Sequence, residues 1–411
     1  MIREGTDMID YRQAQQIVLA QARSFGKEEV RLAEAFGRVL VGPVYADRDY
    51  PPFHRATMDG YALHHDDLEG GIRRFRVVET IFAGARPVRS IRNSECYKIM
   101  TGAAVPGDAD MVIRREDVKE GGRGQEGSPE IELNLVGGEP WRSFLNIARQ
   151  GEDLRVGDPV IDRPCRCEPA VMGLLATLGR TTATVASLPR VSLLTTGNEV
   201  VEPGEPVSAV QIRNSNRWML EAALRKEGIG LAGCGHVADD PGLLKETLRG
   251  SLSSDILILT GGVSAGDADH VPSVLEESGV KKLFHKIAMR PGKPTWCGVT
   301  PGGGMVFGLP GNPFSGLVNF VLLIAPYIHA CWGLGAPAPV GLPLSVARAS
   351  RTSLDEFFPV RLQGSPARLT PVLLNGSGDI RLGMQANALA LHPSDSGDLP
   401  AGAEVTCYSF V

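Results

Sequence analysis

Three glycine-rich turns constrain this chain most, because each one follows an apolar run that is typical of a buried strand. They occupy residues 195–199, 260–267 and 308–313. Glycine and small hydroxyl residues after a strand expose several backbone N–H groups at one sheet edge, where phosphate or another oxyanion can bind. One such turn is commonly only a tight turn. Three in the same region predict a large ligand with several negative charges.

The turns do not match the best-known nucleotide motifs. None reads G-x-G-x-x-G or G-x-x-x-x-G-K-[ST], so neither a dinucleotide-binding fold nor a P-loop is indicated. Their surroundings alternate between strand patterns at 191–194, 231–237 and 256–259 and helix patterns at 215–227 and 241–252. Such alternation predicts a mainly parallel sheet covered on both faces. Ligands then bind at the carboxyl ends of the strands, where the turns fall.

The remaining segments show different patterns of expected secondary structure. The first 45 residues are expected to be mainly helical, with a helix capped by Asp10 and another over 32–39. Residues 53–154 contain short strand patterns and a glycine-rich stretch, 119–128, that we expect at the tip of a hairpin. A short helix is expected over 168–178. The last 80 residues predict strands at 344–349, 357–362, 367–374 and 404–408.

Composition narrows the classes of function. The net charge of −5 over 411 residues argues against general nucleic-acid binding, which needs a basic face. The N-terminus lacks the pattern of a secretory signal, and the apolar stretch 314–332 fits a buried helix better than a membrane span. We therefore expect a cytoplasmic protein without a membrane or nucleic-acid partner. The seven scattered cysteines predict no disulfide framework, and Cys165 and Cys167 are expected to be reduced thiols rather than metal ligands.

Several charged residues accompany the turns. Carboxylates gathered in one cleft with a phosphate ligand would bind Mg²⁺, and the candidates are Glu199, Asp239, Asp240, Asp267 and Asp269. Helix capping is an equally good interpretation of Asp239 and Asp240. The cations Lys286, Arg290 and Lys293 can hold an oxyanion, or can form a solvated basic strand. In an extended segment, Lys286 and Arg290 would share a face.

Together these segments resemble the MoeA family of molybdopterin molybdenumtransferases, to which the C-terminal domain of gephyrin is related. The resemblance covers nearly the whole chain. It rests on P-P-F-x-x-x-x-M-D-G-Y-A over 51–62 and on segments 101–117, 146–153, 195–216, 260–269, 286–298 and 308–315.

The resemblance implies an elongated homodimer of multidomain subunits with α/β and β architecture. The expected domains are an elongated helical/β domain (1–50 plus 155–186), a small β-rich domain (51–154), a MogA-like three-layer α/β domain with a parallel-rich sheet (187–332) and a C-terminal β-barrel (333–411). The implied reaction joins molybdate to adenylylated molybdopterin with Mg²⁺-dependent release of AMP. The implied partners are a MogA-type adenylyltransferase and acceptor molybdoenzymes.

Site residues follow from the resemblance by position. Asp59, Glu199 and Asp269 are the expected catalytic residues, and the cleft is expected between the α/β domain of one subunit and the β-rich domain of the other. The ligand-binding candidates are Thr101, Asp153, Thr196, Gly197, Gly261, Gly262, Ser264, Lys286, Arg290, Lys293, Pro310, Gly311, Asn312, Pro313 and Ser377.

The chain departs from the family pattern at several positions. Asn198 and Asn214 stand where aspartate is usual, Ala148 stands where a cation is common, Arg290 replaces a lysine, and Arg381 lies near a usual small hydroxyl. An asparagine adds no charge, so we expect weaker Mg²⁺ binding. These departures also fit an alternative, a non-catalytic molybdopterin carrier or a gephyrin-like scaffold. Preference for tungsten is a third, weaker possibility.

Overall fold

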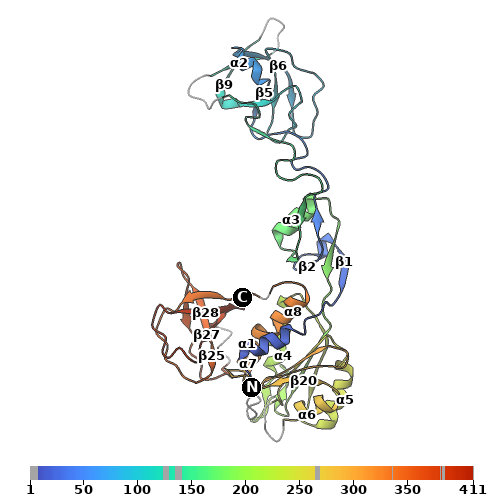
Figure 1. Ribbon diagram of the computed structural model, residues 1–411, viewed down its shortest axis with the longest axis vertical. Helices are drawn as coiled ribbons and strands as arrows, with labels where there is room; N and C mark the ends of the chain where they lie inside the picture. Colours follow the sequence, from blue (N-terminus) through green and yellow to red (C-terminus); the bar gives the residue numbers. More distant parts are fainter. Residues whose placement is uncertain are drawn as a thin grey trace, which may run out of the picture. The chain divides into compact units, whose positions relative to one another are not determined.

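The computed structural model describes residues 8–123, 129–134, 141–263, 269–335, 337–379, 381 and 385–410. The predicted ligand-binding residue Ser264 and the predicted Mg²⁺ ligand Asp267 lie outside them. The chain divides into two compact units. The first unit comprises Met1–Val41, Pro164–Leu174 and Arg180–Val411, and the second comprises Gly42–Arg163 and Leu175–Gly179. Each unit is described by itself (Figure 1).

The second unit is built on a six-stranded sheet of order β8-β5-β7-β6-β10-β9. Its strands are β5 (Gly60–Leu63), β6 (Arg74–Ile81), β7 (Glu95–Ile99), β8 (Met111–Arg114), β9 (Val118–Arg123) and β10 (Pro129–Leu133). They confirm the strands predicted in this region. Shorter elements are α2 (His65–Glu69), the 3₁₀ turn Arg115–Asp117 and the pairs β4 (Arg55–Ala56) with β11 (Ile147–Ala148) and β3 (Val44–Tyr45) with β12 (Pro159–Ile161). The predicted hairpin tip is only partly described, because residues 124–128 lie outside the described ranges.

The N-terminal part of the first unit begins with helix α1 (Tyr11–Leu19), and the Asp10 side chain accepts a hydrogen bond from the Gln13 amide as predicted. The second predicted helix is wrong. Residues 32–39 form a short 3₁₀ turn (Leu32–Glu34) that leads into β2 (Val39–Leu40), and β2 joins a sheet of order β1-β14-β2-β13. Strand β1 (Lys27–Arg31) pairs with β14 (Thr182–Ala186), a partner too distant in sequence for local periodicity to reveal. Helix α3 (Pro169–Thr177) confirms the helix predicted over 168–178, and strand β13 (Cys165–Arg166) completes the sheet.

A mixed six-stranded sheet of order β18-β15-β19-β23-β22-β20 forms the core of the first unit. Strands β15 (Val191–Thr196), β18 (Leu231–Val237), β19 (Ile256–Thr260) and β23 (Met305–Leu309) are parallel, whereas β22 (Trp296–Val299) and β20 (Lys281–His285) add an antiparallel edge. The helices are α4 (Ser215–Lys226), α5 (Pro241–Ser251), α6 (Val271–Glu277), α7 (Pro313–Asn319) and α8 (Ala325–Cys331), with a π-helical stretch Phe320–Ile324 between the last two. The mainly parallel sheet agrees with the prediction.

Helices cover both faces of this sheet because neighbouring strand residues point to opposite sides. Leu193 and Ile258 pack with residues of α1, α4, α7 and α8. Leu194 and Leu257 pack with residues of α5 and α6 on the other face. Figure 1 shows the two groups of helices around the sheet. By length and composition, the stretch Pro313–Cys331 is the one helix among the described residues that could cross a membrane, but it is mostly buried here, as predicted for a core helix.

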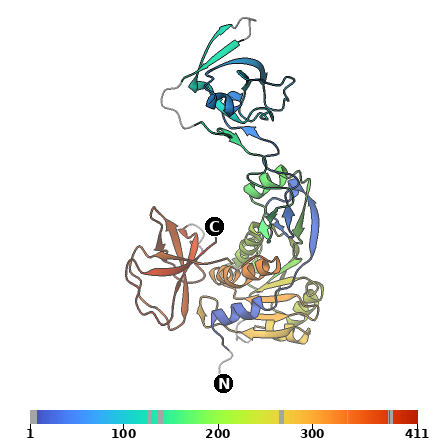
Figure 2. The same cartoon turned by 45° about the horizontal axis from the view of Figure 1, so that its top comes forward.

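A second sheet of the first unit has the order β21-β25-β27-β28-β24, with β26 paired to β25. Figure 2 draws its C-terminal strands in orange and red. Its strands are β24 (Val340–Pro343), β25 (Asp355–Gln363), β26 (Arg368–Pro371), β27 (Ala388–His392), β28 (Glu404–Ser409) and β21 (Met289–Arg290). The predicted strand 344–349 is wrong, since only Leu344 and Arg348 form isolated bridges there. Strand β27 was not predicted. Because β21 comes from the preceding α/β segment, Arg290 lies beside Glu356 of β25.

Candidate functional site

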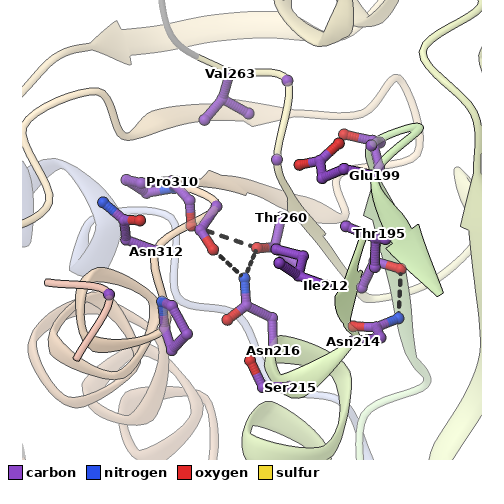
Figure 3. A pocket seen from close by; sticks show the side chains of 18 of the residues that line it. Thr195, Glu199, Ile212, Asn214, Ser215, Asn216, Thr260, Val263, Pro310 and Asn312 are labelled. Carbon is purple, nitrogen blue, oxygen red and sulfur yellow. Dashed lines mark hydrogen bonds between the residues drawn. The ribbon is translucent and has the colours of Figure 1, made fainter. Parts of the chain in front are cut away.

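The three glycine-rich turns meet at one cavity. Strands β15, β19 and β23 are neighbours in the sheet, and the turns follow their carboxyl ends. The cavity has a volume of about 960 Å³ and is called the glycine-turn cavity here (Figure 3). It brings together many of the predicted site residues, namely Thr196, Gly197, Glu199, Asp239, Gly261, Gly262, Asp269, Pro310, Gly311, Asn312 and Pro313.

The second turn packs its backbone tightly against the first. Gly261 has φ +96°, and a Cβ built on it would lie 2.6 Å from the Thr196 carbonyl oxygen. A Cβ on Gly262, at φ +62°, would lie 3.0 Å from the Thr196 Oγ1. Glycine alone adopts these conformations without strain and leaves room for such an approach. The two glycines therefore let the second turn lie against the first at the wall of the cavity, while the Gly261 amide donates to the Leu309 carbonyl at 3.1 Å.

Two buried polar atoms of this cavity lack protein partners among the described residues. They are the Oγ1 of Thr196 and the Oδ1 of Asn216. The other end of the Asn216 amide is engaged, because Nδ2 donates to the Thr260 Oγ1 at 2.8 Å and to the Gly311 carbonyl at 2.7 Å (Figure 3). Asn216 thus joins the second and third turns. Buried polar atoms are nearly always satisfied, so both orphan atoms point to a polar ligand.

Asn214 has a structural reason to be an amide. The residue is 3% exposed, and its Nδ2 donates to the Thr195 Oγ1 and to the Glu202 Oε1, both at 2.9 Å. Its Oδ1 accepts from the Arg217 amide and caps α4. A carboxylate cannot donate these two hydrogen bonds. The hydrogen-bond partners of residue 214 therefore suit an asparagine rather than the aspartate that the resemblance implies.

The carboxylates divide between lining the cavity and capping a helix. Glu199, Asp239 and Asp269 line the glycine-turn cavity, whereas the Asp240 Oδ1 accepts from the Leu243 amide at 2.8 Å as the cap of α5. Magnesium commonly uses one or two protein carboxylates and completes its shell with phosphate oxygens and water. Glu199, Asp239 and Asp269 supply hard oxygens of the type that this ion prefers, but the three carboxylates do not form one close group of ligand atoms among the described residues.

Asn198 fixes the position of Asp239. The backbone N–H of Asn198 donates to the Asp239 Oδ2 at 3.2 Å. The backbone N–H of Asp239 donates to the Asn198 side-chain Oδ1 at 3.2 Å. This exchange joins the turn after β15 to the start of α5. Because its oxygen is already used, Asn198 supports a carboxylate of the cavity from behind.

A second cavity of about 870 Å³, called the cation cavity here, lies between the mixed sheet and the C-terminal sheet. It shares Pro294, Pro310 and Asn312 with the glycine-turn cavity. Two predicted cations, Arg290 and Lys293, line it together with Ser377 and with Arg351, which sequence reasoning missed. Asn312 and Ser377 are joined by a hydrogen bond of 2.8 Å. The side chains of Arg290, Lys293 and Arg351 form no ion pair with any described residue, which suits an oxyanion site.

Lys286 differs from expectation. It does not share an extended face with Arg290, because β20 ends at His285 and Lys286 has φ +71° in the left-handed region. Lys286 lies outside the described lining of both cavities. Left-handed backbone at a lysine is uncommon and is often kept for a purpose.

The remaining predicted residues belong to the second unit. The Asp59 Oδ1 accepts hydrogen bonds from both the amide and the hydroxyl of Thr101, each at 2.7 Å. These two bonds hold the pKa of Asp59 below its usual range. Asp153 is exposed, and its amide donates to the Tyr50 carbonyl. Asp59 is thus a positioned, ionised carboxylate.

Sequence reasoning did not single out Ser215 and Asn216 at the start of α4 as site residues. Asn214, Ser215 and Asn216 precede the apolar periodicity of α4 and line the glycine-turn cavity. Polar residues of this kind before a helix are an N-cap signal. That signal places them at the carboxyl edge of the sheet, beside the turns.

Comparisons with known proteins agree over the length of the chain. Residues 9–179 match the family model for the MoeA N-terminal region (domain I and II), and residues 192–330 match the model for a probable molybdopterin binding domain. A molybdopterin molybdenumtransferase of Staphylococcus epidermidis is 30% identical over 410 residues, which cover 96% of this chain and 94% of the relative. One from Synechocystis is 28% identical over 90% of this chain and 92% of the relative.

Solved structures give the same picture. Two structures of the molybdopterin biosynthesis MoeA protein from Pyrococcus horikoshii align with 98% of this chain. One has a TM-score of 0.83 at 26% identity and is covered completely, and the other has a TM-score of 0.78 at 31% identity and is covered to 99%. On this full-length similarity, the chain belongs to the MoeA family of molybdopterin molybdenumtransferases.

Proposed function

We propose that this chain is a molybdopterin molybdotransferase, which inserts molybdenum from molybdate into adenylylated molybdopterin and releases AMP. The observation that carries the proposal is the pair of adjoining cavities. One has a backbone cradle and carboxylates for a phosphorylated ligand, and the other has unpaired cations for an oxyanion. The similarity to molybdopterin molybdenumtransferases supports the same conclusion.

In this proposal the glycine-turn cavity holds the pterin and its phosphates. The orphan oxygens of Thr196 and Asn216 bind polar groups of that ligand. Glu199, Asp239 and Asp269 are the carboxylates that would hold Mg²⁺, and the ion would supply positive charge beside the phosphates. Asn198 positions Asp239, and Asn216 holds the second and third turns at a constant spacing.

Molybdate is bound in the cation cavity before transfer. Arg290, Lys293 and Arg351 supply positive charge, and the Ser377 hydroxyl supplies a hydrogen-bonding group. The shared wall of Pro294, Pro310 and Asn312 places an oxyanion there next to the pterin ligand. Binding both reactants side by side lowers the entropic cost of their reaction.

The active protein is a cytoplasmic homodimer in this proposal. The β-rich domain of one subunit brings Asp59, Thr101 and Asp153 to the α/β domain of the other. The predicted domain division, 1–50 plus 155–186, 51–154, 187–332 and 333–411, is retained, with the last domain as a β-barrel. Substrate comes from a MogA-type adenylyltransferase and product goes to acceptor molybdoenzymes.

The alternative is a molybdopterin carrier or gephyrin-like scaffold without turnover. It is motivated by the amides at Asn198 and Asn214, which lower the negative charge near the Mg²⁺ candidates. The hydrogen bonds that the Asn198 and Asn214 side chains make within the protein favour the enzyme over the carrier, because they give each asparagine a structural role.

Release of AMP from adenylylated molybdopterin separates the two readings. With Mg²⁺, the enzyme is expected to release AMP only when molybdate is added, and Glu199→Gln or Asp269→Ala should reduce that rate by about 10²–10³-fold. Exposed Glu205→Gln is the matched control and should act like wild type. Tight ligand binding without AMP release would refute the enzyme and support the carrier. Full turnover in both site variants would refute the site assignment.

A further inference from the structure

The cation cavity contains one carboxylate among its described lining residues, Glu356 of β25. A carboxylate in an oxyanion site is expected to weaken oxyanion binding, because it repels the anionic ligand and can pair with the cations that would bind it. Glu356 is placed to do both, since it lies opposite Arg290 in the β21–β25 register. Even so, Glu356 forms no ion pair with Arg290, because the Glu356 carboxylate pairs with another residue.

The partner of Glu356 is Arg348. The Arg348 Nη2 lies 2.9 Å from the Glu356 Oε2, and both residues are only 9% exposed. The guanidinium carbon of Arg348 lies 3.9 Å from the centre of the Phe358 ring. The Arg348 backbone exchanges two hydrogen bonds of 2.8 Å with Leu399. Arg348 is therefore fixed from its backbone to its charged end.

His392 holds the other edge of the guanidinium. It is 2% exposed and pairs with Glu356 in the β25–β27 register. Its Nε2 lies 2.6 Å from the Gly397 carbonyl oxygen. Since a carbonyl only accepts, Nε2 carries the proton and Nδ1 accepts from the Arg348 Nη1. The imidazole thus directs Arg348 toward Glu356 without adding a competing carboxylate.

We infer that Arg348 and His392 are positioning residues that mask the charge of Glu356 and so keep Arg290, Lys293 and Arg351 available to the oxyanion. This inference rests on the proposed oxyanion site in the cation cavity. Arg348 acts through Glu356 and is not itself a ligand. The cavity then presents three cations without an ion pair, while the charge of its carboxylate is offset by Arg348, although the Glu356 Oε2 forms no well-aligned hydrogen bond with a described residue.

The reasoning is electrostatic. Unmasked, Glu356 either pairs with Arg290, its register neighbour, or leaves an uncompensated negative charge beside a dianion. Both outcomes weaken oxyanion binding, because Glu356 is buried and water screens its charge only in part, whereas Arg290, Lys293 and Arg351 are exposed. Restoring neutrality at position 356 should therefore rescue a protein that lacks Arg348.

The test is direct binding of molybdate to the full-length protein by isothermal titration calorimetry. Arg348→Met should weaken binding by roughly tenfold or more, and the double variant Arg348→Met/Glu356→Gln should return to within about threefold of wild type. His392→Leu should weaken binding, and His392→Asn should restore it in part, because its Oδ1 can accept from Arg348. Arg361→Met, an exposed guanidinium on the same strand, is the control and should bind like wild type.

Three results would overturn the inference. Equal affinity in Arg348→Met and wild type would exclude masking. Loss of affinity that Glu356→Gln does not rescue would make Arg348 a direct ligand. Absence of molybdate binding to wild-type protein would remove the proposed oxyanion site and this inference with it. If Arg348→Met does not fold, the Glu356→Gln and His392→Leu variants test the inference instead. The inference then requires that Glu356→Gln bind molybdate at least as tightly as wild type and that His392→Leu bind it more weakly.

Discussion

Substituting Gly261 by alanine tests the idea that close approach of two turns builds the ligand cradle. Gly261 has φ +96°, which a residue with a Cβ rarely adopts. The added Cβ would lie 2.6 Å from the carbonyl oxygen and 2.8 Å from the Oγ1 of Thr196. The first contact is with backbone, so no rotation of a side chain relieves it.

The expected cost has two parts. Left-handed backbone at alanine costs about 1–2 kcal/mol. Forcing a methyl group into a packed contact costs about 1–3 kcal/mol more. The free energy of unfolding of the first unit should therefore fall by about 2–5 kcal/mol. Relief by separating the turns would also displace the Thr196 Oγ1 from the cavity and weaken binding of the adenylylated ligand.

Urea unfolding followed by tryptophan fluorescence measures the effect. Three of the four tryptophans, Trp218, Trp296 and Trp332, lie in the first unit and report on it. Gly250→Ala is the matched control. Gly250 lies in α5 with no atom within 4 Å of an added Cβ, so alanine should stabilise the protein by about 1 kcal/mol. Equal stabilities of Gly261→Ala and wild type would refute the close-approach argument.

Two further predictions concern the first unit and the assembly. Burial raises the pKa of Glu227, but the hydrogen bonds and charges of His329 and Arg166 outweigh burial and hold that pKa below its ordinary value. The network therefore stabilises the fold fully above the ordinary pKa of Glu227 and loses that contribution as pH falls toward the folded-state pKa. Glu227→Gln should lower the free energy of unfolding by about 1–3 kcal/mol near neutral pH, with a smaller loss in acid. A loss that does not change with pH would contradict this account. For the proposed dimer, co-expression of Asp59→Asn and Glu199→Gln chains should recover about a quarter of wild-type AMP release. About half of the dimers are then mixed, and in each mixed dimer one of the two shared sites contains both wild-type residues. No recovery in verified mixed dimers would exclude a site shared between subunits.

Local patterns in the sequence predicted the elements that surround the ligand. Apolar runs followed by glycine and small hydroxyl residues identified β15, β19 and β23 and the turns after them. Strand–helix alternation then predicted the sheet edge at which the glycine-turn cavity lies. These signals are local, because a strand's burial and a turn's backbone depend on residues a few positions apart.

Pairing over long distances escaped the same reasoning. The segment 32–39 carries a helical pattern but enters a sheet, since β2 pairs with strands from beyond residue 164. Lys286 and Arg290 were expected on one extended face, but the chain turns between β20 and β21 to reach β25. Tertiary contacts outweigh local propensity where a strand finds its partner far along the chain.

The sequence by itself determined that glycine-rich turns follow the strands of an α/β sheet at one edge, because glycine positions and strand periodicity encode that arrangement directly. Only the tertiary structure decided which charged groups serve the adjoining cation cavity. Arg290 and Arg351 line it from different segments, while Arg348 pairs with Glu356 in its wall and contacts His392. Whether a charge is paired or available depends on distances of a few ångströms between residues remote in sequence, and those distances are set by packing.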